Sequence, residues 1–145
     1  MKKNNDYILE FVIGGFSSGS RRIVWDGYSF NLNIIDYGYQ DLKADYHFND
    51  NNFPSEEKNI PEKERWKKFW NVIDNINVWK WEKEYFDRRV LDGTQWELLI
   101  KRKGRRKRRI SGSNDYPKED KGLLKLQAAI NELIDDDFFD INDDY

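Results

Sequence analysis

The fold is decided first by residues 22–34, which read RIVWDGYSFNLNI. Asp26-Gly27 separates two runs of strand-forming residues, and Asp-Gly in this setting is the strongest short signal for a β-hairpin. After the turn, every second side chain is apolar or aromatic, so these side chains share one face. Residues 7–13 alternate in the same way. The sequence therefore predicts an antiparallel meander in which Tyr28, Phe30, Leu32 and Ile34 point one way.

The rest of the chain predicts a helix, more strands and a final helix. Pro61 is expected to open a helix with an aromatic stripe, and Pro117 to open the last helix. Residues 77–91 predict one extended strand that ends in a second hairpin turn at Asp92-Gly93. Residues 94–101 and 105–110 predict two further strands around a turn at Lys103-Gly104. The expected buried helix residues are Trp66, Phe69, Trp70, Ile73 and Ile76, then Leu123, Leu126, Ile130 and Leu133.

This order of elements predicts an α+β fold. We expect an antiparallel sheet of about five strands, built from hairpins, with both helices on one face. Residues 1–134 are expected to form a single domain and residues 135–145 an acidic C-terminal tail. Charged residues make up 36% of the chain, but six Trp, eight Tyr and nine Phe supply enough ring area for a small core.

Positive charge is concentrated in residues 101–109, KRKGRRKRR, where eight cations surround one glycine. Like charges held side by side repel one another unless an anion lies against them. That anion is nucleic acid, an acidic protein, or the tail, which carries six Asp and no Lys or Arg. The candidate binding residues are Lys101, Arg102, Lys103, Arg105, Arg106, Lys107, Arg108 and Arg109. A candidate autoinhibitory or recognition segment contains Asp135, Asp136, Asp137, Phe138, Phe139 and Asp140.

Residues suited to catalysis are sparse. The chain has no Cys, and its one histidine, His47, lies in the polar connection 36–60 without a recognisable nucleophile nearby. Asp36, Asp41, Asp45 and the tail carboxylates lack the spacing of a calcium loop. We therefore expect no enzyme, no metal site and no cofactor. The absence of a signal peptide and of a membrane-length apolar run predicts a cytoplasmic protein with no membrane partner.

Three segments of the second half carry a resemblance. They are WEKEY at 81–85, DGTQWEL at 92–98 and GSNDYP at 112–117. Their order and spacing over residues 60–134 resemble an uncharacterised family of small bacterial proteins with W-x3-Y, DG-x-x-W and G-x-N-x-Y-P patterns. The resemblance implies a fold and no activity. The same residues also have a purely structural explanation, because they suit turns, a helix start and an inward strand position.

Three functions from different classes remain open. The first is a non-enzymatic bacterial protein that binds another macromolecule through complementary charge, in an immunity-type or phage-defence accessory role. The second is a nucleic-acid-binding module that uses residues 101–109, with Trp79, Trp81 and Tyr85 as stacking surfaces. The third is a small metal-dependent hydrolase built on Asp36 or Asp45. It is also possible that the cations only solubilise a long hairpin.

Overall fold

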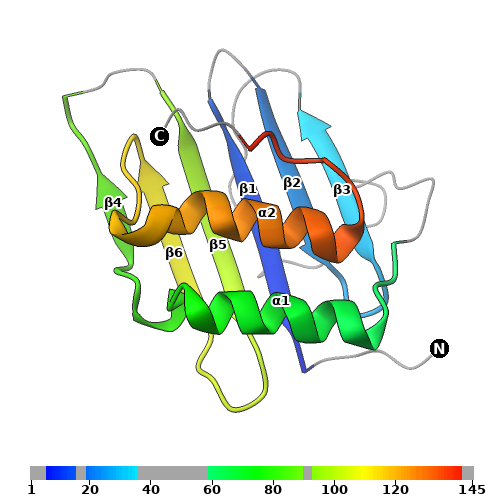
Figure 1. Ribbon diagram of the computed structural model, residues 1–145. Helices are drawn as coiled ribbons and strands as arrows, with labels where there is room; N and C mark the ends of the chain where they lie inside the picture. The colour runs from blue at the N-terminus through cyan, green and yellow to red at the C-terminus, as the bar shows by residue number, and fades with distance from the viewer. Residues whose placement is uncertain (1–5, 16–18, 36–58, 90–92, 142–145) are drawn as a thin grey trace.

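The computed structural model describes residues 6–15, 19–35, 59–89 and 93–141. These residues confirm the α+β class: one mostly antiparallel sheet has the strand order β3-β2-β1-β5-β6-β4, and two helices cover one of its faces (Figure 1). The strands are β1 Ile8–Gly15, β2 Gly19–Trp25, β3 Phe30–Ile35, β4 Glu84–Phe86, β5 Gln95–Lys101 and β6 Arg108–Ser113. The helices are α1 Lys63–Asn75 and α2 Gly122–Ile134, with short 3₁₀ helices η2 Val78–Lys80 and η3 Glu119–Lys121.

The N-terminal meander is confirmed, with a longer turn than predicted. Strands β2 and β3 are antiparallel, and their last pair is Trp25 with Phe30. The carboxylate of Asp26 accepts the backbone N–H groups of Tyr28 at 2.7 Å and Ser29 at 2.9 Å. These bonds hold a four-residue loop, so Tyr28 lies outside the strand and is 43% exposed. The prediction that Tyr28 belongs to the strand and shares a face with Phe30 is therefore wrong.

The single strand predicted for residues 77–91 is also wrong. Helix α1 is followed by Asn77 in the left-handed conformation, at φ 61°, and then by η2. Val78 and Trp81 are both buried, which the spacing of a 3₁₀ turn allows. The carbonyls of Trp79 and Trp81 accept hydrogen bonds from Arg108 rather than from a neighbouring strand. In the described part of this segment, residues 77–89, only Glu84–Phe86 forms a strand.

Strand β4 occupies an unexpected place in the sheet. It pairs with β6 in parallel, with Tyr85 opposite Gly112, and β6 lies between β4 and β5. Strands β4 and β5 are therefore not partners in a hairpin, and the hairpin predicted at Asp92-Gly93 is wrong. Gly93 is described, whereas Asp92 lies outside the described residues. The sheet has six strands in the described chain instead of about five.

Both helices bury the stripes that their spacing predicted, although both begin later than expected. Helix α1 starts at Lys63, with Pro61 before its N-cap, and α2 starts at Gly122 after η3 rather than at Pro117. Trp96, Leu98 and Ile100 of β5 are fully buried, as their alternation predicted. The buried helix residues are Trp66, Phe69, Trp70 and Ile73 of α1 and Leu123, Leu126, Ile130 and Leu133 of α2, while Ile76 packs against this core partly buried.

Two glycines let tryptophan rings approach the backbone. A Cβ atom on Gly112 would lie 1.9 Å from Nε1 of Trp96, and one on Gly122 would lie 2.7 Å from Cζ2 of Trp81. The indole N–H of Trp96, which lies in the space left by Gly112, donates to the carbonyl of Asp115 at 2.9 Å. Trp96, the tryptophan of the DG-x-x-W segment, is therefore in contact with both other segments. Gly112 and Asp115 of the G-x-N-x-Y-P segment lie against it, and Trp81 and Tyr85 of the W-x3-Y segment pack on its ring.

The described part of the tail packs onto the domain. Phe138 and Phe139 are buried, and Phe139 meets Phe11 edge-to-face at 5.2 Å. The side chain of Asn131 donates to the carbonyl of Phe139 at 2.9 Å and accepts its N–H at 3.0 Å. Arg21 donates to the carbonyl of Phe138 at 3.0 Å. These contacts attach the tail, through its aromatic residues, to the end of α2 and to the sheet.

Candidate functional site

The basic segment forms one hairpin, as predicted. Strand β5 ends at Lys101, β6 begins at Arg108, and their last pair is Ile100 with Arg108. Arg105 donates its backbone N–H to the carbonyl of Arg102 at 3.1 Å within the turn. In Figure 1 the loop between β5 and β6 extends past α1 at one end of the sheet. Residues 101–109 are called the basic hairpin below.

Arg102 joins the basic hairpin to α1. Its guanidinium lies over the ring of Trp70, 5.2 Å from the centroid, and donates to Asp74 Oδ2 at 3.1 Å. Asp74 Oδ1 accepts the indole N–H of Trp79 at 2.8 Å. The rings of Trp70 and Trp79 are themselves stacked, with centroids 6.3 Å apart. A cation above an indole face is electrostatically attracted to it. This arrangement therefore fixes the hairpin at the point where β5 ends.

Arg105 and Arg108 make further contacts to the same region. The guanidinium of Arg105 lies 5.5 Å from the ring centroid of Trp79. Arg108 donates to the carbonyls of both Trp79 and Trp81. Three of the predicted binding residues are therefore occupied by contacts that stabilise the fold. The sequence suggested Trp79 and Trp81 as stacking surfaces. Trp79 is in contact with these arginines, and the ring of Trp81 is largely buried.

Most of the other cations of the basic hairpin are exposed, as is Arg105. Lys103, Arg106 and Lys107 are exposed. Arg109 lies 3.9 Å from a carboxylate oxygen of Glu97 on the neighbouring strand, and Lys101 is half-buried. The side chain of Glu97 is largely buried, whereas that of Arg109 is exposed, and their separation is long for an ion pair. The exposed positive charge of the hairpin is therefore concentrated at its tip and at the start of β6.

The acidic tail and the basic hairpin lie at opposite ends of the sheet in the described residues. Figure 1 shows the tail running along the end of the sheet at which β1 stops and β2 starts, away from the β5–β6 loop. Asp135 pairs with Arg65 of α1 at 3.4 Å, and Asp136, Asp137 and Asp140 are exposed. As far as Ile141, the tail covers apolar core rather than the basic hairpin. Residues 142–145 lie outside the described residues.

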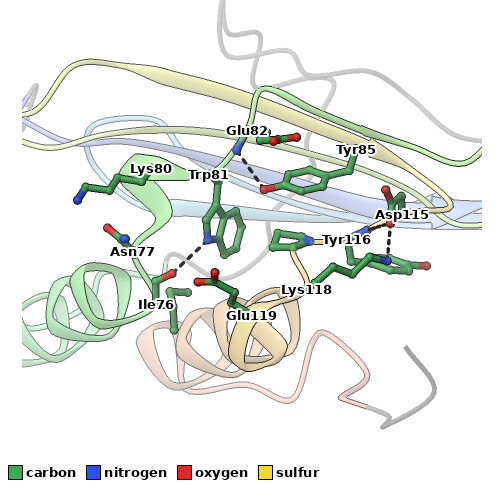
Figure 2. A pocket seen from close by; sticks show the side chains of 11 residues that line it. Ile76, Asn77, Lys80, Trp81, Glu82, Tyr85, Asp115, Tyr116, Lys118 and Glu119 are labelled. Atoms are coloured by element: carbon green, nitrogen blue, oxygen red, sulfur yellow. Dashed lines mark hydrogen bonds and ion pairs between the residues drawn. The ribbon is translucent and has the colours of Figure 1, made fainter.

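A surface pocket of about 520 Å³ lies beside β4 (Figure 2). Its residues come from the end of α1 and η2, from the approach to β4, and from the loop between β6 and α2. The pocket brings together two of the three segments that carry the family resemblance, because Trp81 and Tyr85 line it together with Tyr116 and Pro117. The remaining lining residues are Ile76, Asn77, Lys80, Glu82, Asp115, Lys118 and Glu119.

Hydrogen bonds fix the rings and one carboxylate of this pocket. Trp81 donates its indole N–H to the carbonyl of Ile76 at 3.1 Å, and the Tyr85 hydroxyl accepts the N–H of Glu82 at 3.0 Å. Burial raises the pKa of Tyr85. An ion pair of 2.6 Å with Lys118 lowers the pKa of Asp115.

Sequence reasoning located the basic hairpin and missed the pocket. Eight neighbouring cations are a local signal, whereas the pocket joins residues that are far apart in the chain. Glu82, Lys118 and Glu119 carry no pattern of their own. The one available signal was the resemblance, whose W-x3-Y and Y-P segments supply the aromatic wall.

The predicted catalytic and metal candidates are not assembled in the described residues. His47, Asp36, Asp41 and Asp45 lie outside these residues. Within 6–15, 19–35, 59–89 and 93–141, no group of three or more His, Asp or Glu side chains is placed to hold a metal ion. Neither α1 nor α2 has the length and apolar character needed to cross a membrane, and the same holds for the rest of the described chain.

No protein-family model and no curated protein matches this chain. The resemblance to small bacterial proteins therefore stays a prediction.

Proposed function

We propose that the chain is a non-enzymatic, cytoplasmic bacterial protein that binds an acidic surface of another protein, in an immunity-type or phage-defence accessory role. The observation that carries this proposal is the basic hairpin, which extends beyond α1 and is fixed by its own arginines. A surface held in one conformation before binding loses less entropy when its partner arrives. Complementary charge also speeds encounter and selects among partners.

A protein partner is favoured over single-stranded nucleic acid by the state of the aromatic rings. Sequence-tolerant binding of single strands uses exposed rings on which bases stack. Trp70 is buried, and Trp79 has Arg105 above it. Trp81 and Tyr85 line the pocket beside β4, whose lining includes no residue of the basic hairpin. The exposed cations Lys103, Arg106 and Lys107 are suited to attract carboxylates without such rings. Binding of duplex DNA through phosphates alone is the competing outcome in the experiment below.

The test compares two variants with equal changes of charge. The hairpin variant carries Lys103→Glu, Arg106→Glu and Lys107→Glu. The control variant carries Lys63→Glu, Lys67→Glu and Lys68→Glu on the exposed side of α1. Wild type and both variants are immobilised and exposed to nuclease-treated bacterial lysate at low and high salt. Mobility shifts with a short DNA duplex are measured in parallel.

The expected result is one or more protein species that wild type and the control variant retain at low salt and that the hairpin variant does not retain. High salt should release these species, because exposed charges are screened. If wild type and the hairpin variant retain the same proteins, the proposal is wrong. If only the DNA duplex distinguishes the two variants, the hairpin is a nucleic-acid site instead.

A further inference from the structure

The pocket beside β4 is large enough for a ligand of its own. A volume of about 520 Å³ falls within the range of small-molecule sites, which is roughly 300 to 1,000 Å³. Three chain segments form its walls (Figure 2). One wall is aromatic and apolar, and the groups around it are charged. This combination suits a ligand that has both an apolar part and a charge.

The aromatic wall is fixed in place. Trp81 is held by its bond to the Ile76 carbonyl and by an edge-to-face contact with Trp96 at 6.3 Å. Tyr85 lies 5.9 Å from Trp96 and receives the N–H of Glu82 on its hydroxyl oxygen. That hydroxyl still has a proton to donate. Rings such as these attract cations through their faces and exclude water from an apolar stem.

The charges around the pocket favour a cation. Glu82 and Glu119 are exposed carboxylates at its rim, whereas Asp115 is already paired with Lys118. The C-terminal end of α1, which is the negative end of its dipole, lies at the pocket and has no basic residue in its last turn. In Figure 2 the side chain of Lys80 points away from the ring of Trp81. The positive charge on Lys80 therefore does not occupy the space beside the indole.

We infer that this pocket binds an organic cation, namely a guanidinium or primary ammonium group carried on an apolar stem. The stem packs against Trp81 and Tyr85, and the cation lies between the rings and the carboxylates of Glu82 and Glu119. This site is separate from the basic hairpin, which attracts the opposite charge, and does not depend on the function proposed for that hairpin. Such a cation is carried either by a free amine or by an arginine or lysine side chain of a protein.

The experiment is a titration of the ¹⁵N-labelled protein followed by NMR. N-acetylarginine methylamide represents a protein side chain, and agmatine represents a free amine. N-acetylcitrulline methylamide is the matched control, since it has nearly the same shape without the charge. The expected result is saturable shifts of the Trp81 indole N–H and of the amides of residues 80–85 and 115–119. The citrulline compound should bind at least about fivefold more weakly than the arginine compound.

Variants test the two carboxylates directly. Glu82→Gln and Glu119→Gln should each weaken the binding of the cation about two- to fivefold. Glu132→Gln, which removes an exposed carboxylate from α2 outside the pocket, should leave binding unchanged. Tighter binding of agmatine than of the arginine compound assigns the site to a free amine, and the reverse order assigns it to a protein side chain.

Three results would overturn the inference. They are equal binding of the arginine and citrulline compounds, shifts that do not saturate at these residues, and unchanged affinity in the Glu82→Gln, Glu119→Gln double variant. The ¹⁵N spectra of the variants also report whether each one is folded, so a loss of binding is not confused with a loss of structure.

Discussion

The guanidinium of Arg102 lies over the indole of Trp70, 5.2 Å from the ring centroid, and at the same time donates to Asp74. Asp74 accepts the indole N–H of Trp79 with its other oxygen. The basic hairpin is thus joined to the end of α1 by its own charged side chains. Some residues that the sequence suggested for contact with a ligand therefore also stabilise the fold. Mutations of these residues have to be distinguished from mutations of the exposed cations at the tip of the hairpin.

Arg108→Met should destabilise the protein. The substitution removes two donors and leaves the carbonyls of Trp79 and Trp81 without the hydrogen bonds they accept from Arg108. Hydrogen bonds to a charged group contribute about 1.5 to 3 kcal/mol, so we expect the free energy of unfolding to fall by about 2 kcal/mol or more. Urea denaturation monitored by tryptophan fluorescence measures this change.

The matched control is Arg106→Met, which removes an exposed arginine from the same hairpin. Its effect on the free energy of unfolding should stay within about 0.5 kcal/mol, as for most surface substitutions. Equal effects of the two substitutions would contradict the structural role assigned to Arg108.

Gly112→Ala should be strongly destabilising because of a single methyl group. The new Cβ would lie 1.9 Å from Nε1 of Trp96, and the indole would have to move away from the carbonyl of Asp115. Overpacking of this kind costs about 1 to 3 kcal/mol, and the lost hydrogen bond adds to it. Thermal unfolding measures the result. Gly104→Asn should be tolerated far better, because a Cβ added at Gly104 would meet no atom of a non-adjacent residue within 4 Å and Asn tolerates the φ of 87° better than most residues.

The N-terminal meander could be predicted because its signal is local. Alternation in Tyr7–Ile13 and around Asp26-Gly27 sets both the strands and the face that meets the helices. The same alternation did not predict that residues on the opposite face of the sheet are also buried. Glu10 and Arg22 lie on that face with no exposed surface, and two charged residues in a strand ordinarily indicate contact with water.

Residues 77–91 could not be predicted because their partners are distant. The bonds from Arg108 to the carbonyls of Trp79 and Trp81 span 29 and 27 residues, and the neighbour of β4 is β6 rather than β5. The pocket has the same origin, since Trp81 and Tyr116 line one pocket although they are distant in the chain. Local patterns predict an element, whereas the position of an edge strand depends on contacts between distant segments.

Asn131→Ala should loosen the tail without unfolding the sheet. The substitution removes both hydrogen bonds that Asn131 makes to the backbone of Phe139 and leaves those buried groups unsatisfied. We expect a loss of about 2 kcal/mol in the free energy of unfolding. Hydrogen exchange should become faster at the amide of Phe139 and stay slow in β1 and β5. Asp137→Ala, at an exposed position in the same tail, should change neither quantity.

The pair of Asp87 and Arg89 predicts a specific pH dependence. The side chain of Arg89 donates to both carboxylate oxygens, at 2.9 and 3.0 Å, and lowers the pKa of Asp87 from 3.8 to about 2. Because folding lowers this pKa, the pair stabilises the folded state fully above pH 3.8 and loses that contribution as the pH falls to about 2. A ¹³C NMR titration of the Asp87 carboxyl should therefore have its midpoint near 2.

Arg89→Gln should return that midpoint toward 3.8, because it removes the donor with the largest effect on the pKa. Arg88→Gln is the matched control: the guanidinium of Arg88 lies 5.7 Å from the ring centroid of Phe86 and not against Asp87. The midpoint should therefore stay near 2 in the Arg88 variant. A wild-type midpoint already close to 3.8 would mean that the pair does not persist in solution, since a carboxylate held by two charge-assisted hydrogen bonds is protonated only at lower pH.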